Sequence, residues 1–557
     1  MDSQRLFAWA FFSLLLLMTW QAWQQDYATP APVTEQTAAA TAAPADAVLP
    51  DLDTTDLDAV PTTENASGDL PAVSAPAPTT DYVTVKTDVL DIKINLRGGD
   101  IVEASLPVYP VSKHDPDQFV ETLTDQGDRY GVFRTGLTSG AEDDPNHLAQ
   151  FTTARSDYTL ADGEDVLVVP LRWSNDAGLS VTKSLTFKRG SYRIDLDFDV
   201  ANATDAQWAA RPYGRIVHTV ESPDRSMFDV ESYSFKGPVV FDGEKYKKHS
   251  PDDLEDEPVR KNDITNGWVA AIEHHFLSAI VPAADAPTRL EAGITGDRFI
   301  AGIVSPALIV APGERANTSL TLFTGPKLQE QLEQISDRLP LTVDYGILTL
   351  LADPLFWLLS KVFSFVGNWG WAIIIVTLLI KLAFYKLTEA SGRSIAKMRK
   401  LQPRLKAIQE RYADDRQKLS QAMMELYKRE KVNPAAGCLP ILIQMPFFLA
   451  FYWVLLESVE MRQAPFMLWI QDLSVRDPLF VLPLLMGAAM LMQQRLNPAP
   501  ADPVQAKVMK VLPVVFTLFF AFFPAGLVLY WFTNTLLGVA QQWKINKVVE
   551  AEDKKRD

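Results

Sequence analysis

The sequence predicts an α-helical polytopic membrane protein with six transmembrane helices and one all-β domain outside the cytoplasm. Three observations lead to this fold class. Residues 82–324 alternate between apolar and polar side chains, residues 345–557 contain long apolar segments, and the two parts differ in charge. The chain of 557 residues has a net charge of -17, yet residues 345–557 hold 25 Lys and Arg against 16 Asp and Glu. An acidic part and a basic, apolar part indicate two different environments.

The first 80 residues predict an anchor followed by a tether. Arg5 precedes an apolar run from Leu6 to Trp20, and no small-x-small cleavage site follows that run. We therefore expect residues 1–23 to be an uncleaved transmembrane anchor with its N-terminus in the cytoplasm, rather than a signal peptide. Residues 24–80 are rich in Ala, Thr, Pro and Asp. They lack the apolar side chains that would offset the entropy of folding, so we expect a disordered periplasmic linker.

Residues 81–340 are expected to form the β domain, with a helix at its C-terminal end. Valine and isoleucine alternate with polar residues between 83 and 94. Two similar runs between 185 and 198 flank Arg189-Gly190, a pattern typical of a β-hairpin. Such strands, repeated without intervening helices, indicate an all-β sandwich. Its acidity is compatible with a position outside the cytoplasm, because the positive-inside rule does not forbid large acidic domains there.

Residues 341–368 are predicted to be an interfacial amphipathic helix, and residues 369–387 the second span. The first of these segments is interrupted by Asp353-Pro354 and carries Lys361, which argues against simple insertion across the membrane. The second begins with Trp369 and Trp371, the aromatic residues that mark membrane interfaces.

One cation, Lys381, lies within the apolar run 369–385 of the second predicted span. Lys381 follows Trp371 by ten residues, which corresponds to about 15 Å of depth in a hydrocarbon core of about 30 Å. An ammonium at this depth is costly and marks a functional site. The alternative is a side chain that snorkels to the cytoplasmic headgroups beside Lys386.

Residues 388–435 are predicted to be a charged cytoplasmic helical hairpin. They contain 12 Lys and Arg against 6 Asp and Glu. Apolar residues recur at helical spacing on both sides of Ala413-Asp414-Asp415, where an Asp can cap the second helix. Asn433-Pro434 ends the pair. A docking surface and an ordinary solvated loop that only sets the topology are both compatible with this pattern.

Residues 436–543 are predicted to hold the third to sixth spans, and residues 544–557 a basic cytoplasmic tail. The apolar segments are 439–456, 479–492, 511–523 and 525–540, and their connections alternate between acidic and basic. This alternation places both termini in the cytoplasm. The segment 511–523 has 13 residues, about 20 Å as a helix against a core of about 30 Å, a mismatch that thins the bilayer or requires a protein-lined cavity.

Several polar residues fall within these apolar segments. Thr377 and Lys381 share one face of the second span, Gln444 lies in the third, and Tyr530 and Asn534 share one face of the sixth. Polar groups at membrane depth usually face the interior of the helix bundle. Each alone is explained by hydrogen bonding between helices, but as a set with Lys381 they predict a wet groove containing one positive charge.

The sequence argues against several other classes of function. The predicted membrane segments after residue 345 contain no Asp or Glu, which a proton- or cation-coupled transporter normally needs. There is no phosphate-binding GxxxxGK[ST] motif. All six histidines lie in the predicted β domain, and we expect surface histidines rather than metal ligands. We therefore expect no cofactor, no metal and no catalytic residue.

The chain resembles the YidC family of bacterial membrane-protein insertases over nearly its whole length. The resemblance rests on several sequence motifs, including Met1-Asp-Ser-Gln-Arg, Asn368-Trp-Gly-Trp-Ala-Ile-Ile-Ile, Glu430-Lys-Val-Asn-Pro, Gly437-Cys-Leu-Pro-Ile-Leu-Ile-Gln-Met-Pro and Phe523-Pro-Ala-Gly-Leu-Val-Leu-Tyr.

This resemblance implies a periplasmic β-supersandwich on a five-helix insertase core in the inner membrane. It also implies a hydrophilic groove that is open to the cytoplasm and the inner leaflet and closed toward the periplasm. The implied substrate groove contains Lys381, Thr377, Gln444, Tyr530 and Trp531, and the helix face shared with Tyr530 adds Asn534. The implied cytoplasmic docking residues on the hairpin are Lys397, Arg399, Lys400, Arg404 and Lys406. The partners implied are nascent membrane proteins, the ribosome, the Sec translocon and the phospholipid bilayer, with no specific nucleic-acid sequence.

Two groove positions depart from the usual pattern of the family. Close relatives usually carry Arg where this chain has Lys381, and often a second Tyr where it has Trp531. Lysine keeps the positive charge but lacks the bidentate fork of a guanidinium. The alternative function is a solute transporter or channel whose β domain binds a carbohydrate, because the sandwich resembles carbohydrate-active folds and a fold alone does not determine function.

Overall fold

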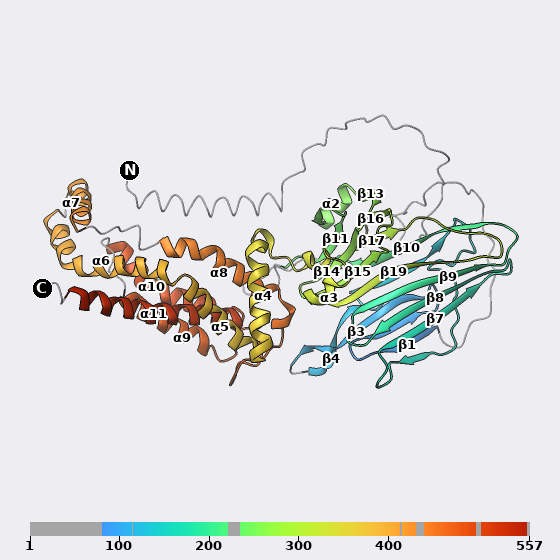
Figure 1. Ribbon diagram of the computed structural model, residues 1–557, viewed down its shortest axis with the longest axis horizontal. Coiled ribbons are helices and arrows are strands. Elements are labelled where there is room, and N and C mark those ends of the chain that lie inside the picture. Colours follow the sequence, from blue (N-terminus) through green and yellow to red (C-terminus); the bar gives the residue numbers. More distant parts are fainter. Residues whose placement is uncertain are drawn as a thin grey trace, which may run out of the picture. The chain divides into compact units, whose positions relative to one another are not determined.

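The structure is a computed structural model that describes residues 81–113, 115–220, 234–412, 415–430, 439–496 and 503–553 (Figure 1). The predicted anchor 1–23 and linker 24–80 lie outside the described residues, as do Asn433, Pro434 and the last four residues of the tail. Within the described residues, the strands precede residue 327 and the long helices follow residue 348.

The described strands form two sheets that together make a β sandwich-like domain (Figure 1). The first sheet has 11 described strands in the order β13 (Val259–Ile264), β16 (Thr288–Thr295), β17 (Arg298–Val304), β10 (Trp208–Thr219), β5 (Gly131–Thr138), β3 (Asp100–Ser112), β2 (Asp91–Asn95), β1 (Tyr82–Lys86) and β6 (Asp157–Thr159), with β18 (Leu308–Val310) on β10 and β4 (Asp115–Leu123) on β3. The second has eight described strands in the order β12 (Tyr246–Lys248), β11 (Gly237–Phe241), β14 (Trp268–Ile272), β15 (Phe276–Pro282), β19 (Arg315–Pro326), β9 (Arg193–Asn202), β8 (Leu179–Lys188) and β7 (Val166–Ser174).

The period-two pattern correctly predicts the first strands and the central hairpin. In β1 and β2, Val83 pairs with Ile94 and Val85 pairs with Ile92. In the hairpin of β8 and β9, Leu185 pairs with Leu196. All six side chains have at most 2% of their surface exposed. Alternation puts every second side chain on the core face, so burial of that face sets the register.

Short helical turns connect the β domain to the long helices. The helix expected at the C-terminal end of the β domain is brief, because α3 (Gln329–Glu333) is followed by the 3-10 turns η2 (Leu339–Thr342) and η3 (Gly346–Leu348). One further short helix, α2 (Pro251–Asp256), interrupts the strands, and a capping box on Ser250 caps its N-terminus. The sequence pattern did not predict α2.

The long helices are α4 (Thr349–Val366), α5 (Trp369–Ala383), α6 (Tyr385–Arg411), α7 (Arg416–Arg429), α8 (Leu439–Glu457), α9 (Val481–Leu496), α10 (Pro503–Phe520) and α11 (Ala525–Asp553). Their bounds differ from those of the apolar segments in the sequence. The α5 helix ends at Ala383 and meets α6 at an angle of 70°. The α10 helix has 18 residues and begins at Pro503, eight residues before the apolar segment 511–523 that the sequence predicts. The helix continues into the polar residues before the apolar run because backbone hydrogen bonding does not stop where side-chain polarity changes.

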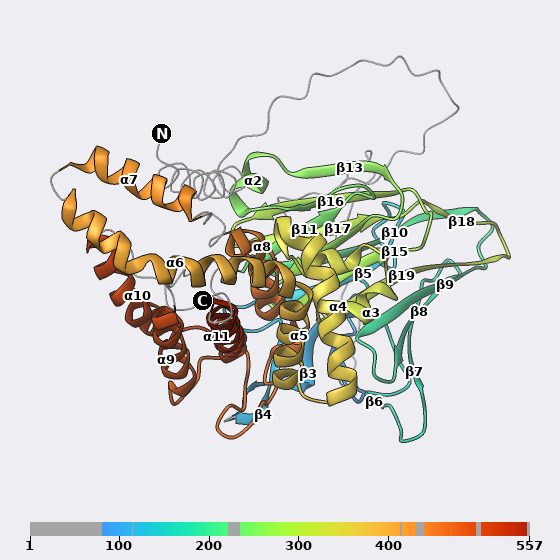
Figure 2. The ribbon, with the colours of Figure 1, turned by 60° about the vertical axis from the view of Figure 1, so that its left-hand side comes forward.

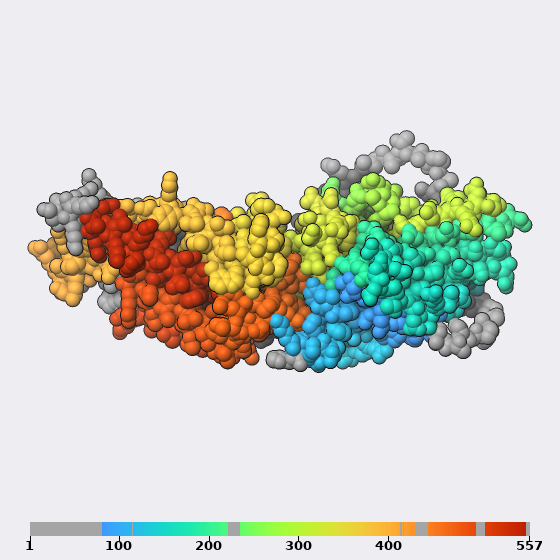
Figure 3. Space-filling view, turned by 60° about the horizontal axis from the view of Figure 1, so that its bottom comes forward, coloured from blue at the N-terminus to red at the C-terminus, as the bar shows by residue number. Residues whose placement is uncertain are grey.

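The α11 helix contacts several of the other long helices. It packs against α5, α6 and α9 (Figure 2). In the space-filling view, the red surface of α11 borders the orange surface of the neighbouring helices (Figure 3). The outward sides of α9 and α10 expose large apolar side chains, including Leu484, Val514 and Leu518, each more than 60% exposed. Exposed apolar surface of this extent indicates contact with lipid.

The α4 helix is amphipathic in its burial. Ala352, Phe356 and Leu359 are buried, whereas Leu350 is 86% exposed and Phe365 is 87% exposed. The stretch Gly346–Val366 is also the one described unbroken helix that is long and apolar enough to cross a membrane by itself. Length and composition therefore permit a spanning position, and the apolar outer face equally suits the interfacial position that the sequence predicts.

Candidate substrate groove

Lys381 lies in the last turn of α5. The helix begins at the N-cap Asn368, whose side chain accepts a hydrogen bond from the backbone amide of Trp371 at 3.1 Å. It ends two residues after Lys381, where the partial negative charge of a helix C-terminus favours a cation. The side chain is partly exposed and has no hydrogen bond or ion pair with another described residue. Lys381 therefore lies near the end of a short helix, and not in the middle of a long helix.

Thr377 is one turn before Lys381 but is not open to the surroundings. It is 1% exposed, and its hydroxyl donates to the carbonyl oxygen of Ile373 at 2.6 Å. The hydrogen-bonding capacity of this side chain is used within its own helix. Thr377 therefore does not line an open surface in this structure.

The three predicted residues of α11 differ in their surroundings. Tyr530 is 3% exposed and packs against the rings of Phe448, at 5.7 Å between centroids, and Phe451, at 4.7 Å. Trp531 is half-buried and meets Phe448 edge-on at 4.5 Å. Asn534 is partly exposed one turn further along. The two aromatic residues thus pack α11 against α8, whereas Asn534 is a partly exposed polar residue.

Gln444 lies in the first half of α8 and is partly exposed. Because α8 and α5 both pack against α11, Gln444, Lys381 and Asn534 come from three neighbouring helices. No hydrogen bond joins any two of the six predicted groove residues within the described chain. Their common feature is their position on these helices, and not a bonded network.

Two residues beside Lys381 were not among those predicted from the sequence. Gly538 of α11 has no side chain, and a methyl group placed on it would lie 3.5 Å from Nε2 of Gln493 and 3.9 Å from Nζ of Lys381. Gln493 belongs to the last turn of α9 and is partly exposed. One signal was available in the sequence, because Gly538 follows Asn534 by four residues and so shares its helix face.

The end of the helical part opposite Lys381 is closed by a bonded loop. Asp477 is fully buried and accepts hydrogen bonds from the indole of Trp469 at 3.0 Å and from the amide of Leu482 at 2.7 Å. The amides of Ala525 and Gly526, at the start of α11, donate to carbonyl oxygens of the same loop. This end therefore contains few free polar groups, in contrast to the region around Lys381.

The predicted docking hairpin is present as α6 and α7. Asp415 caps α7 by accepting from the amide of Lys418 at 3.0 Å, as expected from the sequence. The predicted docking cations all lie on α6 with exposed side chains, and they are Lys397, Arg399, Lys400, Arg404 and Lys406. Arg404 also bonds Glu430 at 2.7 Å, which ties the end of α7 to α6. A surface pair of this kind contributes little stability.

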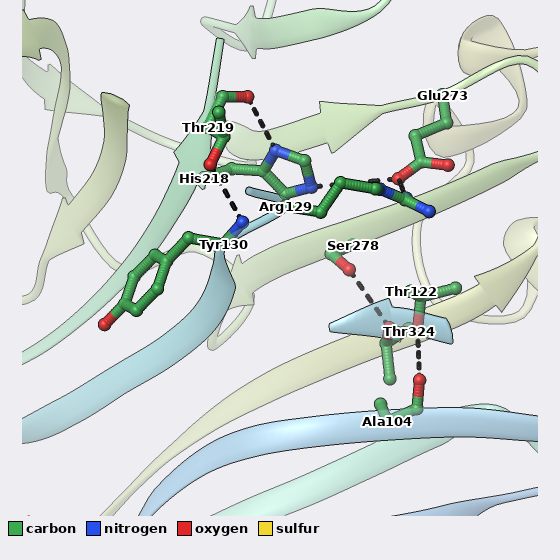
Figure 4. Close-up of polar contacts among 9 residues, drawn as sticks. All are labelled: Ala104, Thr122, Arg129, Tyr130, His218, Thr219, Glu273, Ser278 and Thr324. Carbon is green, nitrogen blue, oxygen red and sulfur yellow. Dashed lines mark hydrogen bonds and ion pairs between the residues drawn. The ribbon is translucent and has the colours of Figure 1, made fainter. Parts of the chain in front are cut away.

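The β domain contains a small polar cavity lined in part by His218, Glu273 and Ser278 (Figure 4). Glu273 lies 2.6 Å from Arg129 and 3.7 Å from His218. The cavity volume of about 10 Å³ is close to the space of one water molecule, so a sugar ring does not fit.

The expectation of surface histidines is wrong for the five that the structure describes, which are all buried: His147, His218, His249, His274 and His275. His274 and His275 do not lie on a strand. They occupy the turn between β14 and β15, and their rings stack at 3.8 Å. Burial lowers the pKa of His275 to about 4, so this histidine is neutral at pH 7. Among the described residues, no group of three or more His, Cys, Asp or Glu is placed to hold a metal ion.

A two-sheet domain joined to apolar helices, with a charged side chain left open among those helices, defines an integral membrane protein with a large extramembrane domain. Comparison with known proteins agrees with this class. The family described as 60Kd inner membrane protein matches residues 361–553, and the YidC periplasmic domain matches residues 82–358.

Named relatives are similar over the full length of the chain. Membrane protein insertase YidC of Thioalkalivibrio sulfidiphilus is 48% identical, with 100% of each chain covered. The insertase YidC of Nitrosococcus oceani is 45% identical over 99% of this chain and 100% of the relative. A crystal structure of an active YidC insertase with its first transmembrane domain resolved matches 83% of this chain and 92% of its own at 20% identity, with a TM-score of 0.37.

The chain belongs to the YidC family of membrane protein insertases. It is accordingly an inner-membrane protein with a periplasmic domain, and it inserts membrane proteins without being an enzyme. This assignment decides against the transporter or channel that the β domain left open as an alternative.

Proposed function

We propose that this insertase receives its substrate in a groove lined by Lys381, Gln444 and Asn534 and supported from behind by Thr377, Tyr530 and Trp531. The observation that carries the proposal is the state of Lys381, a partly exposed cation with no bonded partner among the described residues. A cation within a membrane protein attracts and stabilises an anionic partner. Acidic residues in the translocated tail of a nascent membrane protein supply such a partner.

We propose the membrane topology that the sequence predicts, with six spans, both termini in the cytoplasm and a β-supersandwich in the periplasm. The five-helix insertase core would consist of α5, α8, α9, α10 and α11, with residues 1–23 as the sixth span. The exposed apolar surfaces of α9 and α10 support this topology, because such surface is stable in contact with lipid.

Short helices lower the cost of crossing the membrane. The α5 helix has 15 residues and α9 has 16, which correspond to about 22 to 24 Å against a hydrocarbon core of about 30 Å. A bilayer thins around such helices. The hydrophilic tail of the substrate then crosses a shorter apolar distance, while its apolar helix moves into lipid. Burial of that helix supplies the free energy, so no cofactor is required.

The decisive test is replacement of Lys381. Lys381→Ala is expected to lower insertion of a substrate with an acidic translocated tail about tenfold, the factor that corresponds to about 1.4 kcal/mol. Insertion is measured by protease protection after synthesis onto proteoliposomes that contain the purified insertase. Lys381→Arg should retain activity. Lys361→Ala, which removes an exposed cation from α4, serves as the matched control. Unchanged insertion by Lys381→Ala would remove the groove cation from the mechanism.

We further propose that nascent chains arrive from a ribosome that contacts the exposed cations of α6 and the basic tail, either directly or beside the Sec translocon. Cosedimentation with ribosomes should weaken when the charge is reversed to Glu at Lys397, Arg399, Lys400 and Lys406. Binding by the wild-type protein should also weaken as the salt concentration rises, because salt screens exposed charges. Reversal of Lys507 and Lys510 on α10 is the control for reversed charge outside the hairpin, and it is compared with reversal of Lys397 and Lys400 alone. Equal binding by the hairpin variant and the control variant would contradict a docking role for α6.

A further inference from the structure

A single ammonium holds a carboxylate less specifically than a guanidinium does. A guanidinium offers two parallel N–H groups that match the two carboxylate oxygens, whereas lysine acts as a compact point charge. The surroundings of Lys381 supply a second donor. The closest heavy atoms to a methyl group built on Gly538 are Nε2 of Gln493 at 3.5 Å and Nζ of Lys381 at 3.9 Å.

Both nitrogen atoms can donate further hydrogen bonds. An ammonium and the NH₂ of an amide carry only N–H groups to donate. Neither Lys381 nor Gln493 has a hydrogen bond or ion pair with another described residue, and both side chains are partly exposed. They come from different helices, α5 and α9, and converge on the surface of a third, α11.

Gly538 keeps the space between these donors open. Any other residue at position 538 would place at least a Cβ in van der Waals contact with both nitrogen atoms. A carboxylate oxygen that accepts from a nitrogen lies about 2.8 Å from it. A side chain at position 538 would therefore occupy space next to both donors and would hinder the approach of a carboxylate.

We infer that Lys381, Gln493 and Gly538 form a two-donor site for one carboxylate of the inserting chain. The substrate class is a translocated segment that bears Asp or Glu. Lys381 supplies the charge, Gln493 supplies the second hydrogen bond, and Gly538 gives the carboxylate access to both. This inference rests on the proposed role of Lys381 and adds two specificity-determining residues to it.

The test compares substrates that differ at one position of the translocated tail, Asp in one and Asn in the other. Full-length insertase is reconstituted into liposomes, and the inserted fraction of each substrate is measured by protease protection. Gln493→Met keeps the length of the side chain and removes the donor. It should lower insertion of the Asp substrate roughly tenfold to a hundredfold, the loss expected for one hydrogen bond to a charged group, and leave the Asn substrate unchanged.

Gly538→Ala and Gly538→Val test the open space in two steps. Alanine fits at van der Waals distance, so this variant should fold and lose part of the preference for Asp over Asn. Valine should lose more of it. Ala540→Val, on an exposed position of the same helix, is the matched control. If Gly538→Val unfolds on heating earlier than the control, the Gly538→Ala result decides.

A rescue experiment separates a donor role from a structural one. In the Gln493→Met background, Lys381→Arg should restore insertion of the Asp substrate, because the guanidinium brings its own second N–H group. A merely structural role for Gln493 would not be rescued in this way.

The outcomes also separate this inference from the proposed function. The two-donor site would be overturned if Lys381→Ala lowers insertion of the Asp substrate while the Gln493 and Gly538 variants behave like the wild type. The proposed groove would remain in that case. Equal losses for the Asp and Asn substrates in those variants would overturn the two-donor site as well. No effect of Lys381→Ala on either substrate would overturn the proposed function itself.

Discussion

At the scale of single residues, the β domain buries a cation that the alternation of apolar and polar residues in its sequence does not reveal. Lys183 of β8 is fully buried, and its ammonium donates to the carbonyl oxygens of Gly98, at 2.8 Å, and Thr135, at 3.1 Å. Asp100 of β3 lies nearby and accepts from the amide of Thr135 at 3.2 Å. The charge of Lys183 lowers the pKa of Asp100 but does not overcome burial, which raises it to about 7.

This pKa makes the stability of the β domain depend on pH. The unfolded carboxyl titrates near 3.8, so between about pH 4 and pH 7 the folded state binds more protons than the unfolded state. The free energy of unfolding should therefore fall by a few kcal/mol as pH rises through that window, at about 1.4 kcal/mol per pKa unit. Asp100→Asn should flatten the slope.

Pulse proteolysis of the full-length protein in urea, at several pH values, measures this slope. Asp143→Asn, at an exposed position, is the control and should leave the slope unchanged. A slope in Asp100→Asn as steep as that of the wild type would assign the pH dependence to another group.

At the scale of single elements, amphipathicity identifies α4 without deciding its depth in the membrane. Both an interfacial and a spanning helix account for its exposed apolar face and its length. The two positions differ in one measurable way. The ends of a spanning helix lie at different depths, and those of an interfacial helix lie at the same shallow depth.

Spin labels at the two ends of α4 distinguish these positions. Leu350 and Phe365 are both exposed and are 15 residues apart, about 22 Å along a helix. After Cys438, the one cysteine of the chain, is replaced by Ala, single Cys variants at 350 and 365 carry the label. We expect equal and shallow accessibility to oxygen at both positions in bilayers. Leu518 of α10, labelled in the same way, provides a deep reference, and a large difference between 350 and 365 would establish a spanning helix.

At the scale of the whole described chain, one buried polar cluster joins the strands to α8. Nε2 of His275 lies 3.3 Å from the carbonyl oxygen of Leu456, and the hydroxyl of Ser234 donates to Glu457 at 3.3 Å. Lys327 is 3% exposed and follows β19. Burial lowers the pKa of Lys327, and the charge of Glu457 is the main influence that opposes this effect.

The charges of this cluster should therefore depend on one another. Lys327→Met alone should destabilise the protein by about 3 kcal/mol, because it leaves a buried carboxylate without compensation. Lys327→Met with Glu457→Gln should restore much of that loss. The comparison is a double-mutant cycle of thermal unfolding in detergent.

A matched cycle on the partly exposed pair Lys93 and Glu103, 2.9 Å apart, should give less than about 1 kcal/mol of coupling. Additive effects of the Lys327 and Glu457 variants would contradict this account of the cluster.

The sequence by itself determined most of the elements of this protein. Period-two alternation located β1, β2, β8 and β9, because burial of one sheet face requires it. Apolar runs located α5, α8, α9, α10 and α11, and Asp415 predicted the start of α7, because a helix N-terminus needs a side-chain acceptor. Lys381 also stood out in the sequence, since a charge within an apolar run has few explanations.

Only the tertiary structure decided which polar groups are open and which are used in packing. Thr377 and Tyr530 match the predicted pattern as well as Asn534 does, yet both are buried. Gln493 gave no signal of its own and Gly538 only its place on the helix face of Asn534, because their relation to Lys381 depends on the proximity of α5, α9 and α11. Hydrogen-bonding capacity is a local property of a side chain. Its availability depends on what the rest of the chain packs against it, and that is set only when the helices come together.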